Sequence, residues 1–128
     1  MFFSCCYFFF TSKNRGYVGV VYNQKFDDVL PEYVSSTVPK QLSNFEKLLE
    51  MNKSNLSGGE LYFVGNKFNC ADLMVFDMLE LIIRLDAHAL DKFPLLKKHH
   101  AQIAARPNIS KYLESGKRPA KINNSGKG

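Results

Sequence analysis

Residues 61–80 of this chain read LYFVGNKFNCADLMVFDMLE, and this stretch decides the fold. The side chain of Asn69 can accept the backbone N–H of Asp72, whose carboxylate can reach back to the N–H of Asn69, which makes a capping box. Phe68 just before the cap and Leu73 at the fourth helical position form a matching hydrophobic staple. The motif predicts a helix directly after Asn69 with a buried start, because free N–H groups that water cannot reach need such partners.

The helix after this motif is predicted to lie at the centre of the fold. Its apolar residues between Cys70 and Leu85 cover nearly all of its faces, and they are Leu73, Met74, Val75, Phe76, Met78, Leu79, Leu81, Ile82, Ile83 and Leu85. A helix that is apolar all round is buried by its neighbours. Its charged residues, and a length short of the roughly 20 residues that a membrane span needs, argue against a span. We expect Cys70 to be an inert core cysteine.

A second apolar stripe lies upstream of the central helix. Its members recur at spacings of four and three, as on one face of a helix, and they are Leu30, Val34, Val38, Leu42, Phe45 and Leu49. Asp27 or Asp28 can cap the start of this helix, which places Pro31 in the first turn, where a missing N–H is tolerated. Pro39 lies inside the stripe and is expected to kink the helix.

Two further segments complete the predicted bundle. Residues 61–65 are a short apolar run without a second strand to pair with, so we expect an extended connector packed on the core. Phe93-Pro94 opens the next helix, because proline suits a first turn, and Arg106-Pro107 ends it before a short last turn at 109–113. The inner stripe of that helix consists of Leu95, Leu96, His99, Ile103 and Ala104. The sequence therefore predicts an all-α bundle of about four helices around the buried central one.

The composition fits one globular domain. The chain has 128 residues, of which 45% are hydrophobic and 23% are charged, so one core can form without staples. Its net charge of +5 comes largely from lysines and arginines late in the chain. No aromatic residue interleaves the basic run after Tyr112, as a stacking groove for nucleic acid would require. We expect a solvated helix face, and neither a nucleic-acid nor a membrane partner.

The cysteines and histidines offer little metal or disulfide chemistry. The cysteines are Cys5, Cys6 and Cys70, and the histidines are His88, His99 and His100. The cysteines make no disulfide framework, which indicates a reducing, cytoplasmic location. No cysteine and histidine cluster has zinc-site spacing, so no metal is expected. The histidines have no carboxylate or cysteine partner nearby in sequence, and all three are expected to be packing or surface residues.

The chain divides into three predicted segments. Residues 1–16 are an atypical apolar start, MFFSCCYFFF with a polar break, which is too short to span a bilayer and lacks the positive n-region of a signal peptide. Residues 17–119 form the helical domain. Residues 120–128 form a basic tail that is predicted to be disordered.

Three stretches of the sequence resemble, in order, parts of one domain. LYFVGNKFNCADLMVFDMLE at 61–80 resembles the capping-box helix in the C-terminal domain of cytosolic glutathione transferases. FPLLKKHHAQIAARPNISKYLESGKRP at 93–119 resembles the stretch that closes that domain. VYNQKFDDVLPEYV at 21–34 resembles the segment that joins its first two helices, most like the mu and sigma classes. The family usually has Ser or Thr where this chain has Asn69. The resemblance covers about residues 20–119 and implies the helical bundle of that domain.

The resemblance also implies an activity and a missing half. The family transfers the sulfur of glutathione, its co-substrate, to small hydrophobic electrophiles, so these are the implied partners, with no further cofactor. In the family the glutathione site and the catalytic Tyr or Ser lie in a thioredoxin-like domain that comes first. Only 21 residues precede Tyr22, and a βαβ unit alone needs roughly 30. We therefore expect no such domain here, no catalytic residue, and no conjugation by this chain alone.

Tyr22 is the candidate substrate-binding residue. It stands where mu-class enzymes often have a tyrosine at the electrophile site, so its hydroxyl would hydrogen-bond a substrate or a developing anion. The alternative is a packed ring with its hydroxyl at the surface. We expect Asp72 to be a cap rather than an acid. Asp77 and Glu80 are expected to bond backbone or loop groups rather than to form a catalytic pair.

Two functions stay open from the sequence. The first is a truncated glutathione transferase that is inactive alone, and the second is a non-catalytic protein-interaction module of the same helical fold. In either case, apolar surface that the missing half would cover is expected at Tyr17, Val18, Val20, Val21 or on parts of the central helix. Such surface would favour self-association or a protein partner.

Overall fold

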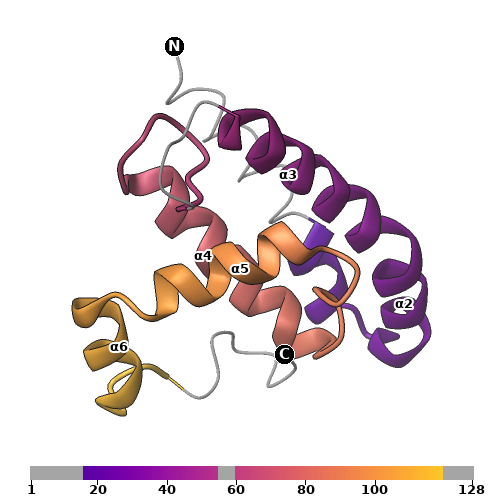
Figure 1. The fold of residues 1–128 in the computed structure, drawn as a ribbon. Helices are drawn as coiled ribbons and strands as arrows, with labels where there is room; N and C mark the ends of the chain where they lie inside the picture. The colour runs from indigo at the N-terminus through magenta and orange to yellow at the C-terminus, as the bar shows by residue number, and fades with distance from the viewer. Residues whose placement is uncertain (1–15, 55–59, 120–128) are drawn as a thin grey trace.

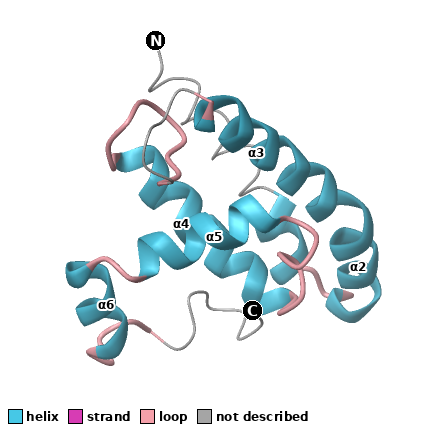
Figure 2. Ribbon diagram, in the orientation of Figure 1, coloured by secondary structure: helices cyan, strands magenta, loops and turns pink. Residues whose placement is uncertain are grey.

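The computed structural model describes residues 16–54 and 60–119, and this part of the chain is built from helices and loops (Figures 1 and 2). The helices are a short one at residues 16–21, α2 (Phe26–Glu32), the π-helical segment η1 (Tyr33–Thr37), α3 (Val38–Lys53), α4 (Cys70–Leu85), α5 (Pro94–Ala104) and α6 (Pro107–Glu114). No strand occurs among the described residues. The all-α prediction is confirmed, while the expectations for 1–15 and 120–128 lie outside the described residues.

The core lies where α3, α4 and α5 meet. Figure 1 shows α3 along the outside of the bundle and α5 crossing α4, with α6 at the far end of α5. Five leucines with 0–1% exposure mark the centre of the core, and they are Leu42, Leu49, Leu61, Leu79 and Leu96. Each supplies roughly 1.5–3 kcal/mol of burial free energy. The predicted stripes on α3 and α5 therefore face inward.

The start of α2 differs from the prediction. The helix begins at Phe26 with Lys25 at the cap position, where no side chain caps it. Asp27 and Asp28 lie in the first turn instead, where their charges suit the helix dipole. Pro31 is consequently inside the helix rather than in its first turn.

The expected disruption at Pro39 takes the form of a wider turn. The π-helical segment Tyr33–Thr37 ends just before this proline, which lies in the first turn of α3. A proline removes one backbone donor and crowds the carbonyl four residues earlier, so the preceding turn must change its hydrogen bonds. In the same segment the hydroxyl of Ser36 donates to the carbonyl of Glu32 at 2.8 Å.

The helix at residues 16–21 packs on the bundle through most of its apolar residues. Tyr17, Val20 and Val21 are buried, and Tyr17 and Val21 form a small cluster with Leu81 of α4. The expectation of bare surface is wrong for these three residues, because Tyr17 and Val21 pack with Leu81 of α4 and Val20 belongs to the main core. The remaining apolar residue for which bare surface was predicted in this segment, Val18, is exposed, at 44%.

Candidate functional site

The start of α4 is fixed by the predicted capping box. The Asn69 side chain accepts the backbone N–H of Ala71 at 2.9 Å, and the Asp72 carboxylate accepts the N–H of Asn69 at 3.0 Å. Both halves of the box are present, and Asn69 adopts the extended backbone of a cap residue. The geometry therefore favours the capping role that the sequence predicts for Asn69 and Asp72.

Asp72 has more partners than a cap requires. It is 0% exposed, and its Oδ1 also accepts the N–H of Phe63 at 2.9 Å and lies 3.1 Å from Nε2 of His99. Three donors from three parts of the chain thus converge on one carboxylate. A buried carboxylate is stable only when it is satisfied in this way. Its oxygens are occupied, so the arrangement favours a structural role over an acid.

His99 is the partner that sequence reasoning missed. It is fully buried on the inner face of α5, and 27 residues separate it from Asp72. When Nε2 carries the proton and donates to Asp72, Nδ1 is an acceptor, and this atom lies buried without a hydrogen-bond partner among the described residues. The inner stripe of α5 already contained His99, and a polar residue on such a stripe signals a buried partner.

Side chains also hold the connector before α4. The backbone N–H and carbonyl of Leu61 pair with the Gln102 side chain at 2.9 and 3.1 Å. Asn52 donates to the carbonyls of Tyr62 and Gly65 at 2.7 and 2.9 Å. These amides take the place of a neighbouring strand, so the extended connector packed on the core is confirmed.

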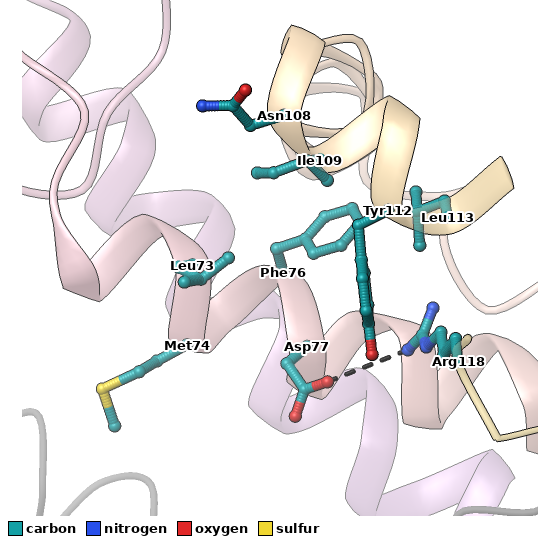
Figure 3. Close-up of a pocket in the computed structure, with 9 residues that line it drawn as sticks. All are labelled: Leu73, Met74, Phe76, Asp77, Asn108, Ile109, Tyr112, Leu113 and Arg118. Atoms are coloured by element: carbon teal, nitrogen blue, oxygen red, sulfur yellow. Dashed lines mark ion pairs between the residues drawn. The ribbon is translucent and has the colours of Figure 1, made fainter. Parts of the chain in front are cut away.

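The predicted hydrophobic staple stays a prediction. Phe68 lies under the Arg106 guanidinium, which is 4.1 Å from the ring centroid. Leu73 is 45% exposed and faces α6 rather than the core (Figure 3). The α4 helix is therefore not covered all round, and Cys70 in its first turn is exposed, so its assignment to the core is wrong.

A groove of about 490 Å³ lies between α4 and α6 (Figure 3). Its lining is mainly apolar and consists of Leu73, Met74, Phe76, Asp77, Asn108, Ile109, Tyr112, Leu113 and Arg118. In Figure 3 the Phe76 ring of α4 points toward α6, and Tyr112 of α6 passes beside it, with its hydroxyl near Asp77 and Arg118 at the polar end of the groove. This volume is in the range of ligand and side-chain pockets.

The polar end of the groove shows the partners of two carboxylates. Glu80 pairs with His100 of α5 at 2.6 Å and with the Arg118 guanidinium, and Asp77 lies 3.8 Å from Arg118. Arg118 lies in the loop after α6, so both acids have the loop partner that the sequence favoured, while the bond of Glu80 to His100 was not expected. Although burial by itself raises the pKa of Glu80, the hydrogen bonds and charges of His100 and Arg118 hold it below its ordinary value.

The histidines are also better partnered than expected. His88 lies 3.0 Å from Asp91, which is three residues away and also pairs with Lys97. Each of His88, His99 and His100 thus has a carboxylate partner. The expectation that none is nearby in sequence is wrong for His88, whereas the partners of His99 and His100 lie 27 and 20 residues away. Among the described residues no group of three or more metal-binding side chains comes together.

Tyr22 lies on a separate, exposed face. Its ring is 52% exposed, and its backbone N–H donates to the carbonyl of Val18 at 3.1 Å. This helical turn places Val18 and Tyr22 on one side, while the other side of the segment is buried on α4. Gly19 between them has nothing within 4 Å of where a Cβ would be, so the surface is open there.

The family model for "Glutathione S-transferase, C-terminal domain" matches residues 14–116. The chain belongs to the glutathione S-transferase family. It is 36% identical over 97 residues to "Glutathione S-transferase P" of Caenorhabditis elegans, which covers 76% of this chain and 44% of that protein. It is 34% identical over 114 residues to "Glutathione S-transferase P" of Bos taurus, covering 87% of this chain and 50% of the bovine protein.

A solved glutathione S-transferase has the same fold. The pi-class enzyme of Onchocerca volvulus matches with a TM-score of 0.80 and 31% identity, over 96% of this chain and 57% of that one. These relatives carry the names P or pi, whereas the segment at 21–34 resembled the mu and sigma classes most. The chain spans about half the length of the curated relatives that it matches. No helix in the described part of the chain is long and apolar enough to cross a membrane.

Proposed function

We propose that this chain is the helical half of a glutathione transferase and supplies the electrophile side of the site. The observation that carries the proposal is the match of residues 14–116 to the C-terminal domain alone, in a chain that spans about half of its relatives. Glutathione would be held and activated by a thioredoxin-like half. A cytoplasmic location, with glutathione and hydrophobic electrophiles as substrates, is part of this proposal.

The chain alone would not conjugate glutathione. A thiol pKa near 8.5 leaves only a few per cent thiolate at neutral pH unless a neighbouring group stabilises the anion. An electrophile surface without a positioned nucleophile also loses the proximity term, worth roughly 7–11 kcal/mol at best. In the family the groups that orient and ionise the thiol belong to the thioredoxin-like half.

Tyr22 and Val18 would form the wall that contacts the electrophile. Val18 supplies exposed apolar surface, and Tyr22 supplies a half-exposed ring with a hydroxyl on the same side of the helix. Apolar lining with one placed polar group is what a pocket for hydrophobic electrophiles needs. The hydroxyl would stabilise negative charge that develops on the electrophile during sulfur attack.

The α4–α6 groove would pack against the thioredoxin-like half. Leu73 and Tyr112 are 45% and 49% exposed there, beside the other apolar side chains of the groove. Exposed apolar surface of this kind marks an interface. The same groove favours the second candidate function, a protein-interaction module, in which another protein would occupy it.

Reconstitution separates the two candidate functions. We expect a thioredoxin-like half from a related transferase to restore conjugation of a chloronitrobenzene substrate, and Tyr22→Phe to slow the restored reaction about tenfold or more. Glu50→Ala is the control, because it removes an exposed side chain of α3 that lies neither in the groove nor beside Tyr22. A restored rate that is unchanged by Tyr22→Phe would contradict the role of Tyr22.

A pull-down tests the second candidate. One stoichiometric protein partner that is not a thioredoxin-like protein, together with no retention on glutathione resin, would support an interaction module. Light scattering of the purified chain measures self-association, which exposed apolar surface favours. A clean monomer with no enhancement of a hydrophobic dye would contradict an open apolar surface.

A further inference from the structure

Helix α6 has little core packing of its own. None of its residues is fully buried, and its apolar side chains Ile109, Tyr112 and Leu113 line the groove instead of filling it. A helix of eight residues is too short to be stable by itself in water. Other contacts must therefore fix α6 against α4.

The chain turns back immediately after α6. Ser115 caps the end of the helix, and Gly116 follows with φ of +67°. This left-handed conformation is one that glycine adopts without strain, and it reverses the chain at a helix end. The turn brings Arg118 to the polar end of the groove, where its side chain is only 16% exposed.

Arg118 ties this returning segment to two other helices. Its Nη1 donates to Oε2 of Glu80 on α4, and Oε1 of Glu80 lies 2.6 Å from Nε2 of His100 on α5. The His100 ring stacks on Phe76 of α4 with centroids 4.8 Å apart and planes at 22°. Asp77 adds a weaker ion pair to Arg118 at 3.8 Å.

We propose that Glu80, His100 and Arg118 form a clasp that sets the position of α6 and thereby the width of the α4–α6 groove. The clasp joins three parts of the chain through one carboxylate whose side chain is 20% exposed. A charge-assisted pair at this burial is screened less than a surface pair, and it keeps one geometry. Opening the clasp frees α6 without disturbing the core under α5.

The clasp is a property of this chain in isolation. Only the identity of what enters the groove rests on the proposed function. A measurement on the free chain can therefore contradict the clasp while the transferase proposal stands. A failed reconstitution would likewise contradict the transferase proposal and leave the clasp intact.

Hydrogen exchange with mass spectrometry tests the clasp on the full chain. We expect Arg118→Ala to speed exchange of amides at 107–118 roughly threefold to tenfold, and to leave those of α4 unchanged. Lys117→Ala is the control, because it removes the same charge one residue earlier from an exposed side chain. Glu80→Gln breaks the clasp from the other side and should give the same local pattern.

Binding of a hydrophobic dye gives the second readout. A freed α6 exposes the groove, so Arg118→Ala should raise dye fluorescence roughly twofold over both the parent chain and Lys117→Ala. Unchanged exchange at 107–118 in Arg118→Ala would overturn the proposal. Faster exchange that spreads equally into α4 would overturn it as well, because the residue would then stabilise the whole fold rather than α6.

Discussion

Two carboxylates on α4 each join several parts of the chain, one fully buried and the other partly buried. Asp72 is 0% exposed and accepts donors from Phe63, Asn69 and His99, whereas Glu80 is one-fifth exposed and bonds His100 and Arg118. Water can replace a lost partner near Glu80 but not near Asp72. Burial, more than the number of bonds, therefore decides how much each carboxylate contributes to the fold.

The largest loss of stability is expected at Asp72, the fully buried carboxylate. Asp72→Ala leaves two backbone donors and a buried histidine unpaired, so the free energy of unfolding should fall by roughly 3–5 kcal/mol. Urea denaturation measures this. Asp72→Asn keeps one oxygen acceptor and should lose less, while Asp77→Ala on the exposed side of α4 should be nearly neutral. An unchanged urea midpoint in Asp72→Ala would contradict the account.

The connector should be the next most sensitive feature. Gln102→Ala removes both partners of the buried Leu61 backbone, so a loss of about 2 kcal/mol is expected, since each unsatisfied buried group costs roughly 1–3 kcal/mol. Thermal unfolding with Gln24→Ala as an exposed control measures the difference. Equal melting temperatures for the two variants would show that water satisfies Leu61.

Glu80, the partly buried carboxylate, should make a smaller and pH-dependent contribution to stability. The pKa of Glu80 is lowered in the folded state from 4.5, because its bonds to His100 and Arg118 outweigh its burial. Its contribution is therefore fully present above the unfolded pKa and is lost as pH falls through the lower folded pKa. We expect Glu80→Gln to cost about 1 kcal/mol at pH 7 and progressively less below pH about 4.5. A difference that grows on acidification would reverse this sign.

Tyr22 should have the smallest effect on stability. Its ring is half exposed on the open face beside Val18, so Tyr22→Phe should change the free energy of unfolding by no more than about 0.5 kcal/mol. Urea denaturation of the variant beside the parent checks this. A larger loss would indicate that the hydroxyl is structural, and the proposed role at the electrophile would lose its support.

The sequence predicted local features well. The capping box, the bounds of α4, the proline start of α5 and the connector each depend on residues within one short stretch, where backbone chemistry dictates the outcome. The partners of Leu61, Asp72 and Glu80 lie 41, 27 and 38 residues away in Gln102, His99 and Arg118. Periodicity identifies which face of a helix is inside, but it does not determine which polar side chains meet there.

The wrong predictions of exposure, for Cys70 and for the segment at residues 17–21, have the same origin. The apolar residues of α4 cover nearly all of its faces and so predict a buried Cys70, yet Cys70 is exposed and Leu73 on the same helix lines an open groove. Bare apolar surface is predicted at Tyr17, Val20 or Val21, yet all three are buried, and Tyr17 and Val21 pack with Leu81 of α4. In both cases the packing of a distant helix decided the exposure, and the sequence pattern does not specify that packing.

The rate of glutathione conjugation by the purified 128-residue chain shows whether the helical half can carry the thiol chemistry by itself. The assay uses a chloronitrobenzene substrate with millimolar glutathione, and calorimetry at the same glutathione concentration measures binding. The account predicts no binding and no rate above background for the chain alone, and a measurable rate once a thioredoxin-like half is added. Robust turnover by the chain alone would contradict the claim that the thiol chemistry resides in the other half.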